Sequence, residues 1–357
     1  MIPNPVFIDN TLGYALKNRQ INAGDFVGLK KKITDMSEMI YDVHIDNIEP
    51  LLDFKNMDFR DIRICIEPKI EQVMAAYVLG SLWVKVLFNP CSDEETAFSF
   101  REALFEANRL KMKVTVGKLD ISEEPEQRMN FFQKLIKENK IYSIIVSDDS
   151  GGLDSLTTYW RLEDVKKKIT CGIEYEGKNT LGLATGNALG AMKSGVAGVA
   201  ASVGGIGGFP AFEEVVMSAC HLLKMPVTVP QNIALCCKEI LEYLGIQVPD
   251  TKAIIGSNIF AHESGIHVDG VMKKSELYEP FAPEEVGLSR RIVIGKHSGR
   301  AAVEQKIKEL NLGMRPSCIV LLLERVRSLA IKQKAALRDE QLKQLAREVV
   351  AYEGRCC

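Results

Sequence analysis

Short apolar runs recur along the first two thirds of the chain, and about one helix separates each run from the next. The runs are rich in β-branched and aromatic residues, which favour strands. They predict strands at Val6–Asp9, Tyr41–Ile45, Arg63–Glu67, Val84–Phe88, Lys113–Val116, Tyr142–Val146, Cys171–Tyr175 and Val199–Val203. Eight such repeats predict a (β/α)8 barrel of the TIM type, whose chemistry lies at the C-terminal ends of the strands. A doubly wound open sheet is the alternative.

Segments with a helical period lie between and after these runs. They predict helices at Asp93–Leu110, Glu126–Asn139, Leu156–Lys168, Phe212–Leu223, Asn232–Leu244, 301–311 and Pro316–Ala351, the last broken near Arg338. The segment 253–300 is rich in loops and motifs. We therefore expect three parts, which are a barrel over 1–225, a crossover subdomain over 226–305 and a helical C-terminal subdomain over 306–357.

The composition is that of an ordinary globular enzyme, with 46% hydrophobic and 26% charged residues over 357 positions. A formal net charge of −2 gives no reason to expect a nucleic-acid partner. The chain has no run of about 18 apolar residues that could span a membrane. Its first residues lack the basic and apolar segments of a signal peptide. We therefore expect a cytoplasmic chain with no membrane partner.

The nine cysteines are scattered, and none forms a C-x-x-C pair. This pattern favours buried or incidental thiols in a reducing compartment over a zinc site or a disulfide framework. Cys356 and Cys357 stand at the end of the sequence, where a frayed tail is favoured over a lipidation or metal feature.

Three of the five histidines fall in one glycine-punctuated segment, which also holds Glu263, Asp269 and Lys296. The predicted strand ends, by contrast, carry carboxylates but no histidine. His262 and His267 are five residues apart, not the four of a helical metal pair. This spacing favours acid–base or substrate contacts over metal ligation. From the residues alone, a structural and a functional role fit the segment about equally.

Residues 258–270 (NIFAHESGIHVDG), 278–281 (YEPF) and 294–300 (IGKHSGR) resemble the C-terminal segment of homocitrate and isopropylmalate synthases. The likeness extends to 153–159, 181–188, 213–217 and 329–342, and it is weak before residue 142. The tail is similar to the short tail of the nitrogen-fixation homocitrate synthases. Members of this family condense acetyl-CoA with a 2-oxo acid on a divalent metal inside a (β/α)8 barrel.

The resemblance also implies that the family's metal site is missing here. In the first-strand motif D-T-T-L-R-D-G, Gly13 replaces the catalytic Arg and Tyr14 replaces the metal-binding Asp. In the seventh-strand motif H-x-H-N-D, Glu176 and Lys178 replace both metal-binding histidines. The glycine-rich stretch 204–210 lacks the family's Asn ligand. Because the charge of Lys178 opposes a bound dication, we expect no metal on this chain, rather than a site rebuilt on Glu176. We expect Lys178 to be solvated or paired with Glu176, with a Schiff-base role as the alternative.

A chain that keeps the C-terminal segment but has lost the metal site resembles the omega subunit of a split homocitrate synthase. In some nitrogen-fixing anaerobes, the alpha subunit of that enzyme carries the metal barrel and the omega subunit carries the C-terminal part. The resemblance implies that His267 acts in trans as general base, with Tyr278 and Glu263 positioning it. The expected partner is a metal-competent alpha-type subunit, which would hold the divalent metal while the complex condenses acetyl-CoA with 2-oxoglutarate.

The residues around the second motif have two interpretations. Lys296, His297 and Ser298 would shape the crossover loops or the CoA side of the site, or they would form a tight turn that docks the subdomain. His262 is expected to be a hydrogen-bonded support residue.

Two other classes of function stay open. In one, the chain is a non-catalytic regulator or scaffold that keeps the segment for dimer packing. In the other, it is an independent enzyme whose new site is built from Asp9, Asp149, Glu176 and Lys178. For the complex, isopropylmalate or citramalate synthesis is the alternative reaction, because the 2-oxo acid pocket lies mostly in the degenerate part.

Overall fold

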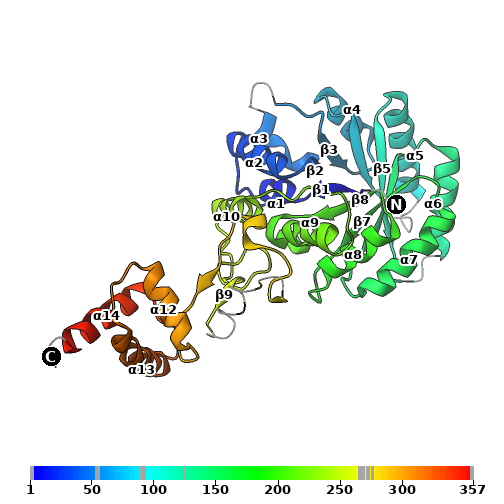
Figure 1. Cartoon of the computed structure of the whole chain (residues 1–357). Helices are drawn as coiled ribbons and strands as arrows, with labels where there is room; N and C mark the ends of the chain where they lie inside the picture. The colour runs from blue at the N-terminus through cyan, green and yellow to red at the C-terminus, as the bar shows by residue number, and fades with distance from the viewer. Residues whose placement is uncertain are drawn as a thin grey trace. The chain divides into compact units, whose positions relative to one another are not determined.

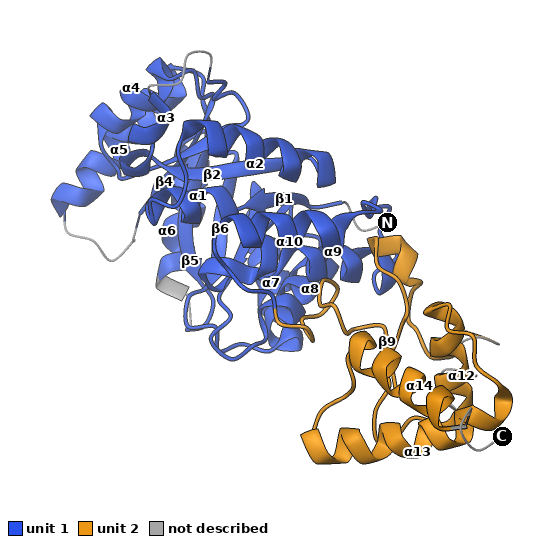
Figure 2. Cartoon of the chain, turned by 90° about the vertical axis from the view of Figure 1, so that its left-hand side faces the viewer, with its two compact units in different colours: residues 1–248 blue, residues 249–357 orange. Residues whose placement is uncertain are grey.

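The computed structural model describes residues 4–52, 57–88, 94–123, 126–263, 270, 274 and 277–353. Its contacts divide the chain into two compact units, 1–248 and 249–357, which Figure 2 shows in different colours. The first unit contains the predicted barrel. The second contains the motif-rich segment and the C-terminal helices.

In the described part of the chain, eight parallel strands close into a barrel, and Figure 1 shows helices around it. The strands are β1 (Val6–Asp9), β2 (Met39–His44), β3 (Ile62–Ile66), β4 (Trp83–Leu87), β5 (Lys113–Asp120), β6 (Ser143–Asp148), β7 (Gly172–Gly177) and β8 (Gly198–Ala201). Each strand pairs with the next, and β8 pairs with β1, where Ile8 lies opposite Ala200. The closed ring confirms the (β/α)8 prediction and rules out the open sheet.

Helices follow the strands, as the pattern predicts. They are α1 (Thr11–Lys17), α2 (Ala23–Met36), α3 (Glu49–Leu52), α4 (Ile70–Val78), α5 (Glu94–Arg109), α6 (Glu126–Glu138), α7 (Ser155–Lys168), α8 (Ala184–Ser194), α9 (Phe212–His221) and α10 (Ile233–Tyr243). Short 3-10 turns occur at η1 (Ile45–Asn47) and η2 (Val203–Gly208). Local chemistry sets some of the ends. Asp154, for example, accepts hydrogen bonds from the Leu156 and Thr157 amides and so caps α7.

The strands are buried on both faces, because helices cover the outside and side chains fill the inside. Every residue of β3 (IRICI) and β6 (SIIVSD) is buried. Successive side chains of a strand point to opposite faces. A charged residue in the middle of such a strand therefore has no route to solvent and needs a partner inside the protein.

The first unit extends past residue 225, the expected end of the barrel, to residue 248. The reason is that α10 packs against α2. The sulfur atoms of Cys237 and Met36, both buried, lie 3.9 Å apart between these helices. Helix α10 is therefore part of the barrel unit.

The second unit has its own core between α12 (Arg300–Glu309), α13 (Pro316–Gln333) and α14 (Asp339–Glu353). Leu322, Val326 and Val349 are fully buried in it. Two short strands, β9 (Ala261–His262) and β10 (Arg291–Ile292), pair in parallel, and η4 (Pro283–Val286) precedes β10. The predicted helical extension is confirmed. Across the described residues of both units, no helix has the length and apolar character that a membrane span requires.

Candidate functional site

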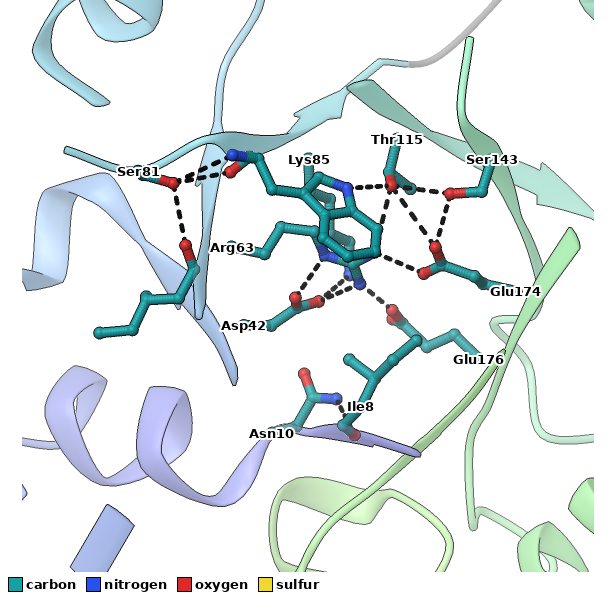
Figure 3. A network of polar contacts seen from close by, with 12 residues as sticks. Ile8, Asn10, Asp42, Arg63, Ser81, Lys85, Thr115, Ser143, Glu174 and Glu176 are labelled. Carbon is teal, nitrogen blue, oxygen red and sulfur yellow. Dashed lines mark hydrogen bonds and ion pairs between the residues drawn. The ribbon is translucent and has the colours of Figure 1, made fainter. Parts of the chain in front are cut away.

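A network of buried charges fills the barrel interior (Figure 3). Arg63 of β3 forms a bidentate pair with Asp42 of β2, with Nε–Oδ1 and Nη2–Oδ2 distances of 2.6 and 2.9 Å. Its Nη1 donates to Glu174 of β7 at 2.6 Å. The Arg63 side chain is only 1% exposed. A lone charge in this position would be very costly, so the two carboxylates are what allow the guanidinium to be buried.

The network continues towards the C-terminal ends of the strands. Lys85 of β4 lies between two carboxylates, with its Nζ 3.0 Å from Asp42 Oδ2 and 2.9 Å from Glu176 Oε2. Lys118 of β5 contacts the other oxygen of Glu176 at 2.9 Å and Asp149 at 3.0 Å. Burial alone would raise the pKa of Glu176, but the ammonium groups of Lys85 and Lys118 bring that pKa well below its ordinary value. Glu176 is therefore an ionised carboxylate with both oxygens in use.

Above the network, the mouth of the barrel holds a cavity of about 430 Å³. Its wall includes Tyr14, Glu176, Lys178 and Phe209. The Asn179 amide donates to the carbonyl of Gly208 at 2.9 Å, which ties the end of β7 to η2. Lys178 Nζ lies 3.7 Å from the centre of the Phe209 ring. The cavity thus combines the residues that replace the family's metal ligands with an aromatic surface.

Of the two expected environments of Lys178, solvated or paired with Glu176, the pairing is not found among the described residues. Lys85 and Lys118 occupy the two oxygens of Glu176, and Lys178 makes no ion pair with any described residue. Its ammonium instead faces the ring of Phe209, a cation–π contact.

The residues at this mouth do not fit a divalent metal. Glu176 already uses both oxygens on ammonium groups, and Lys178 brings a further positive charge. Nowhere in the described residues does a group of three or more His, Cys, Asp or Glu side chains have the arrangement of a metal site. Gly13, where the family has its catalytic Arg, has no room for a side chain, because a Cβ there would lie 2.4 Å from the Asp42 carbonyl oxygen.

Asp9 and Asp149 occupy different surroundings. Asp9 is buried at the end of β1, where the Leu12 amide donates to its Oδ2 at 3.0 Å. Burial raises the pKa of Asp9 to about 6. Asp149 instead shares Lys118 with Glu176. The structure therefore brings Asp149 and Glu176 together and places Lys178 in the cavity beside Glu176, while Asp9 is not among the residues that line the cavity.

In the second unit, the residues of the second motif form a tight turn. Glu263 Oε1 accepts a hydrogen bond from the His297 amide at 2.8 Å. Ser298 is buried, and its Oγ accepts from the Gly295 amide at 2.9 Å. The Lys296 and His297 side chains are exposed. The structure thus brings together Glu263, Lys296, His297 and Ser298. The hydrogen bond from the His297 amide to the Glu263 carboxylate holds the turn.

The other predicted residues of this unit are placed only in part. The Tyr278 ring lies against Gly270, where an added Cβ would meet its hydroxyl, and its side chain is half exposed. His262 Nε2 lies 3.5 Å from Glu279 Oε1, which is within ion-pair reach but outside hydrogen-bond geometry. His267 lies outside the described residues.

The sequence prediction missed the centre of the buried network, which is Asp42, Arg63 and Lys85. A signal was present, because each is a single charged residue inside a short apolar strand, in MIYDVH, IRICI and WVKVL. Such a residue in a strand covered on both faces must point into the barrel. Its partners, however, depend on the closed ring and could not be read from one strand.

Two family models match the chain. Residues 31–240 match the HMGL-like family, which is more than half of the chain. Residues 254–334 match a family described as homocitrate synthase post-HMGL domain-like. The two matches coincide with the barrel unit and with the larger part of the second unit.

Curated relatives and solved structures agree with these matches. The 2-isopropylmalate synthase 2 of Caldanaerobacter subterraneus subsp. tengcongensis is 38% identical over 259 residues, 71% of this chain and 67% of that protein. Homocitrate synthase 1 of a Nostoc species is 40% identical over 206 residues, 56% of this chain and 54% of that protein. The matched part thus spans about half to two thirds of these relatives.

Among solved structures, the HMG-CoA lyase of Bacillus subtilis aligns with a TM-score of 0.54 and 14% identity, over 70% of this chain and 96% of that one. At this identity the likeness speaks for the barrel fold alone. The family models and the curated relatives carry the assignment further. The chain belongs to the HMGL-like family, as the motifs shared with homocitrate and isopropylmalate synthases indicate, and it carries a homocitrate synthase post-HMGL domain-like segment.

Proposed function

We propose that this chain is an omega-type subunit of homocitrate synthase, which supplies residues in trans to a metal-bearing alpha-type partner. The observation that supports the proposal most is a contrast between the two units. In the barrel, the resemblance aligns Glu176 and Lys178 with the family's two metal-binding histidines, and both oxygens of Glu176 are paired with Lys85 and Lys118. In the second unit, residues 254–334 match the homocitrate synthase post-HMGL domain-like family. A chain of this kind can supply the residues of its second unit to the active site of a partner that keeps its own metal.

In this proposal the complex condenses acetyl-CoA with 2-oxoglutarate and supplies homocitrate for nitrogen fixation. His267 removes a proton from the methyl group of acetyl-CoA, and the carbanion equivalent attacks the carbonyl carbon of the oxo acid, whose oxygen takes up a proton. Water then hydrolyses the thioester, which releases CoA and homocitrate. Tyr278 and Glu263 position the imidazole. The partner would hold the divalent metal, which would supply Lewis-acid polarisation of the oxo acid.

The turn at Lys296, His297 and Ser298 is held by hydrogen bonds at two places, which supports a role for it on the CoA side of the site. Glu263 holds the His297 amide, and Arg327 of α13 donates to the Ser298 carbonyl at 2.8 Å. The turn is therefore fastened both to the segment that follows β9 and to the helical core. Fastening of this kind would hold the CoA side of a site in a fixed position.

The test is reconstitution with a homologous chain whose first-strand and seventh-strand motifs are intact. Acetyl-CoA consumption is measured with 2-oxoglutarate and a divalent metal, first with each chain alone and then with the mixture. We expect turnover only on mixing, together with a complex on gel filtration. His267→Ala should lower the rate by about 10²- to 10⁴-fold, the usual contribution of a general base, while leaving the complex intact. Added imidazole should restore part of the lost rate.

Three outcomes would overturn the proposal or part of it in different ways. A complex whose turnover is unchanged by His267→Ala would indicate a regulator or scaffold. Turnover by this chain alone would indicate an independent site in its own barrel. A complex that prefers a branched 2-oxo acid or pyruvate would instead indicate isopropylmalate or citramalate synthesis, an alternative that the 38% identity to an isopropylmalate synthase favours.

A further inference from the structure

We propose that the mouth of the barrel is a second, metal-independent site, at which Lys178 Nζ forms a Schiff base with a small 2-oxo acid. The inference goes beyond the proposed function, because it needs neither the partner chain nor acetyl-CoA. It rests on three features of the cavity, which are the surroundings of one amine, the charge of the wall and the available volume.

The first feature is that Lys178 differs from the other buried lysines at the mouth. Lys85 is shared between Asp42 and Glu176, and Lys118 is shared between Glu176 and Asp149. Lys178 is partly buried, faces the ring of Phe209 and makes no ion pair with a described residue. Lys17 also lines the cavity, but its side chain is exposed. Among the described lysines that line the cavity, Lys178 is therefore the partly buried one for which no ion pair with a described carboxylate is found.

Such surroundings favour the neutral, nucleophilic form of a lysine. Burial lowers the pKa of Lys178, and the positive charges of Lys118 and Lys85 act in the same direction, while Glu176 and Asp149 oppose them. Each unit of pKa decrease raises the fraction of neutral amine at neutral pH about tenfold. Lysines that form Schiff bases in other enzymes are activated in this way, by an apolar wall and a second cation.

The second and third features concern the substrate. With Lys178 neutral, the cavity wall still carries three charged lysines, Lys17, Lys85 and Lys118, against two carboxylates, Asp42 and Glu176. The excess of positive charge favours an anion, so a carbonyl compound that binds here should carry a carboxylate. The volume of about 430 Å³ lies in the range of small-molecule sites and accommodates a short 2-oxo acid.

The chemical step is balanced without any further reactant. The lone pair of neutral Lys178 Nζ attacks the C2 carbonyl carbon, and a proton moves from nitrogen to oxygen to give a carbinolamine. Loss of one water, formed from the hydroxyl group and the remaining Nζ proton, then leaves a neutral imine between Nζ and C2, which can take up a proton from solvent. No electron acceptor or donor takes part, and hydrolysis returns the free lysine and the oxo acid.

Reductive trapping tests the proposal on the full chain without a partner. The protein is incubated with pyruvate or 2-oxoglutarate and cyanoborohydride at neutral pH, and the product is mapped by peptide mass spectrometry. Reduction of the imine raises the mass by that of the acid less one oxygen atom. We expect this adduct on the Lys178 peptide, and none with lactate, which has a hydroxyl group in place of the C2 ketone.

Two variants make the result specific. Lys178→Arg keeps the charge and removes the nucleophile, so the adduct should be lost while the circular dichroism spectrum is retained. Lys193→Arg is the matched control, because Lys193 is an exposed lysine that faces a ring, that of Tyr159, at 5.9 Å. This control should label as the wild type does. Equal labelling of the Lys178→Arg variant, an adduct spread over exposed lysines, or no adduct with either acid would overturn the inference. Each of these outcomes leaves the reconstitution test unaffected.

Discussion

Among single residues, Asp9 offers a sharp pH-dependent prediction. Burial raises its pKa to about 6 in the folded protein, whereas an unfolded Asp has a pKa of about 4. Between these pH values the folded state binds more protons than the unfolded state, so the contribution of Asp9 to stability falls as the pH rises. Asp9→Asn keeps an acceptor for the Leu12 amide and should raise the free energy of unfolding near pH 7.5 by up to about 3 kcal/mol, with little effect near pH 4.

Urea unfolding of both proteins at the two pH values measures this effect. Asp42 provides the control of opposite sign. Burial would raise its pKa, but Arg63 and Lys85 bring it below the ordinary value, so its contribution is present above the unfolded pKa and is lost as the pH falls. Asp42→Asn should therefore destabilise the protein most at neutral pH. An Asp9→Asn variant that is equally destabilised at both pH values would contradict the raised pKa of the buried Asp9 carboxyl group.

At the scale of the element, β4 illustrates how one strand depends on its neighbours. Lys85 is buried between Asp42 of β2 and Glu176 of β7. Lys85→Met keeps the apolar stem but leaves two buried carboxylates each short of a cation. We expect a loss of about 3–5 kcal/mol in the free energy of unfolding, which is the usual cost of breaking a buried pair. Denaturant titration gives this value.

The matched control is Lys113→Met on β5. Lys113 is exposed and faces the rings of Trp83 and Tyr142 at 4.9 and 5.0 Å. Losing an exposed cation–π contact should cost about 1 kcal/mol or less. If the two lysine variants were equally stable, the buried network would not be a determinant of barrel stability.

The sequence predicted individual elements better than the contacts between elements that are distant in the chain. The strands of the barrel and its helices from α5 on, apart from α8, were predicted, because their periods are local properties of the chain. The contact of Arg63 with Glu174 of β7 was not, because β3 and β7 face each other only after the ring closes, whereas Asp42 lies opposite Arg63 on the neighbouring strand β2. The pairing of Lys178 with Glu176 is not found for the same reason. Lys85 of β4 and Lys118 of β5, which are distant from Glu176 in sequence, each form an ion pair with one of its oxygens.

At the scale of the whole molecule, the prediction concerns metal dependence. A ligand that binds only the folded state raises its stability in proportion to the logarithm of ligand concentration over Kd. In the barrel, ammonium groups stand where a dication would have to be placed, and they neutralise the carboxylate that would hold it. The melting temperature of the isolated chain should therefore be the same with a chelator and with millimolar-range magnesium, manganese or zinc.

The reconstituted complex allows the metal dependence of the partner's barrel to be distinguished from that of the barrel of this chain. A chelator should abolish its turnover, because the partner's metal is removed, while the melting temperature of this chain measured alone stays unchanged. Glu176→Gln sharpens the comparison, since it removes the carboxylate without adding a charge. A metal-induced rise in the melting temperature of the wild-type chain that disappears in this variant would mean that Glu176 still binds a cation. A metal would then be able to displace Lys85 and Lys118 from Glu176, and the assignment of the metal to the partner alone would be wrong.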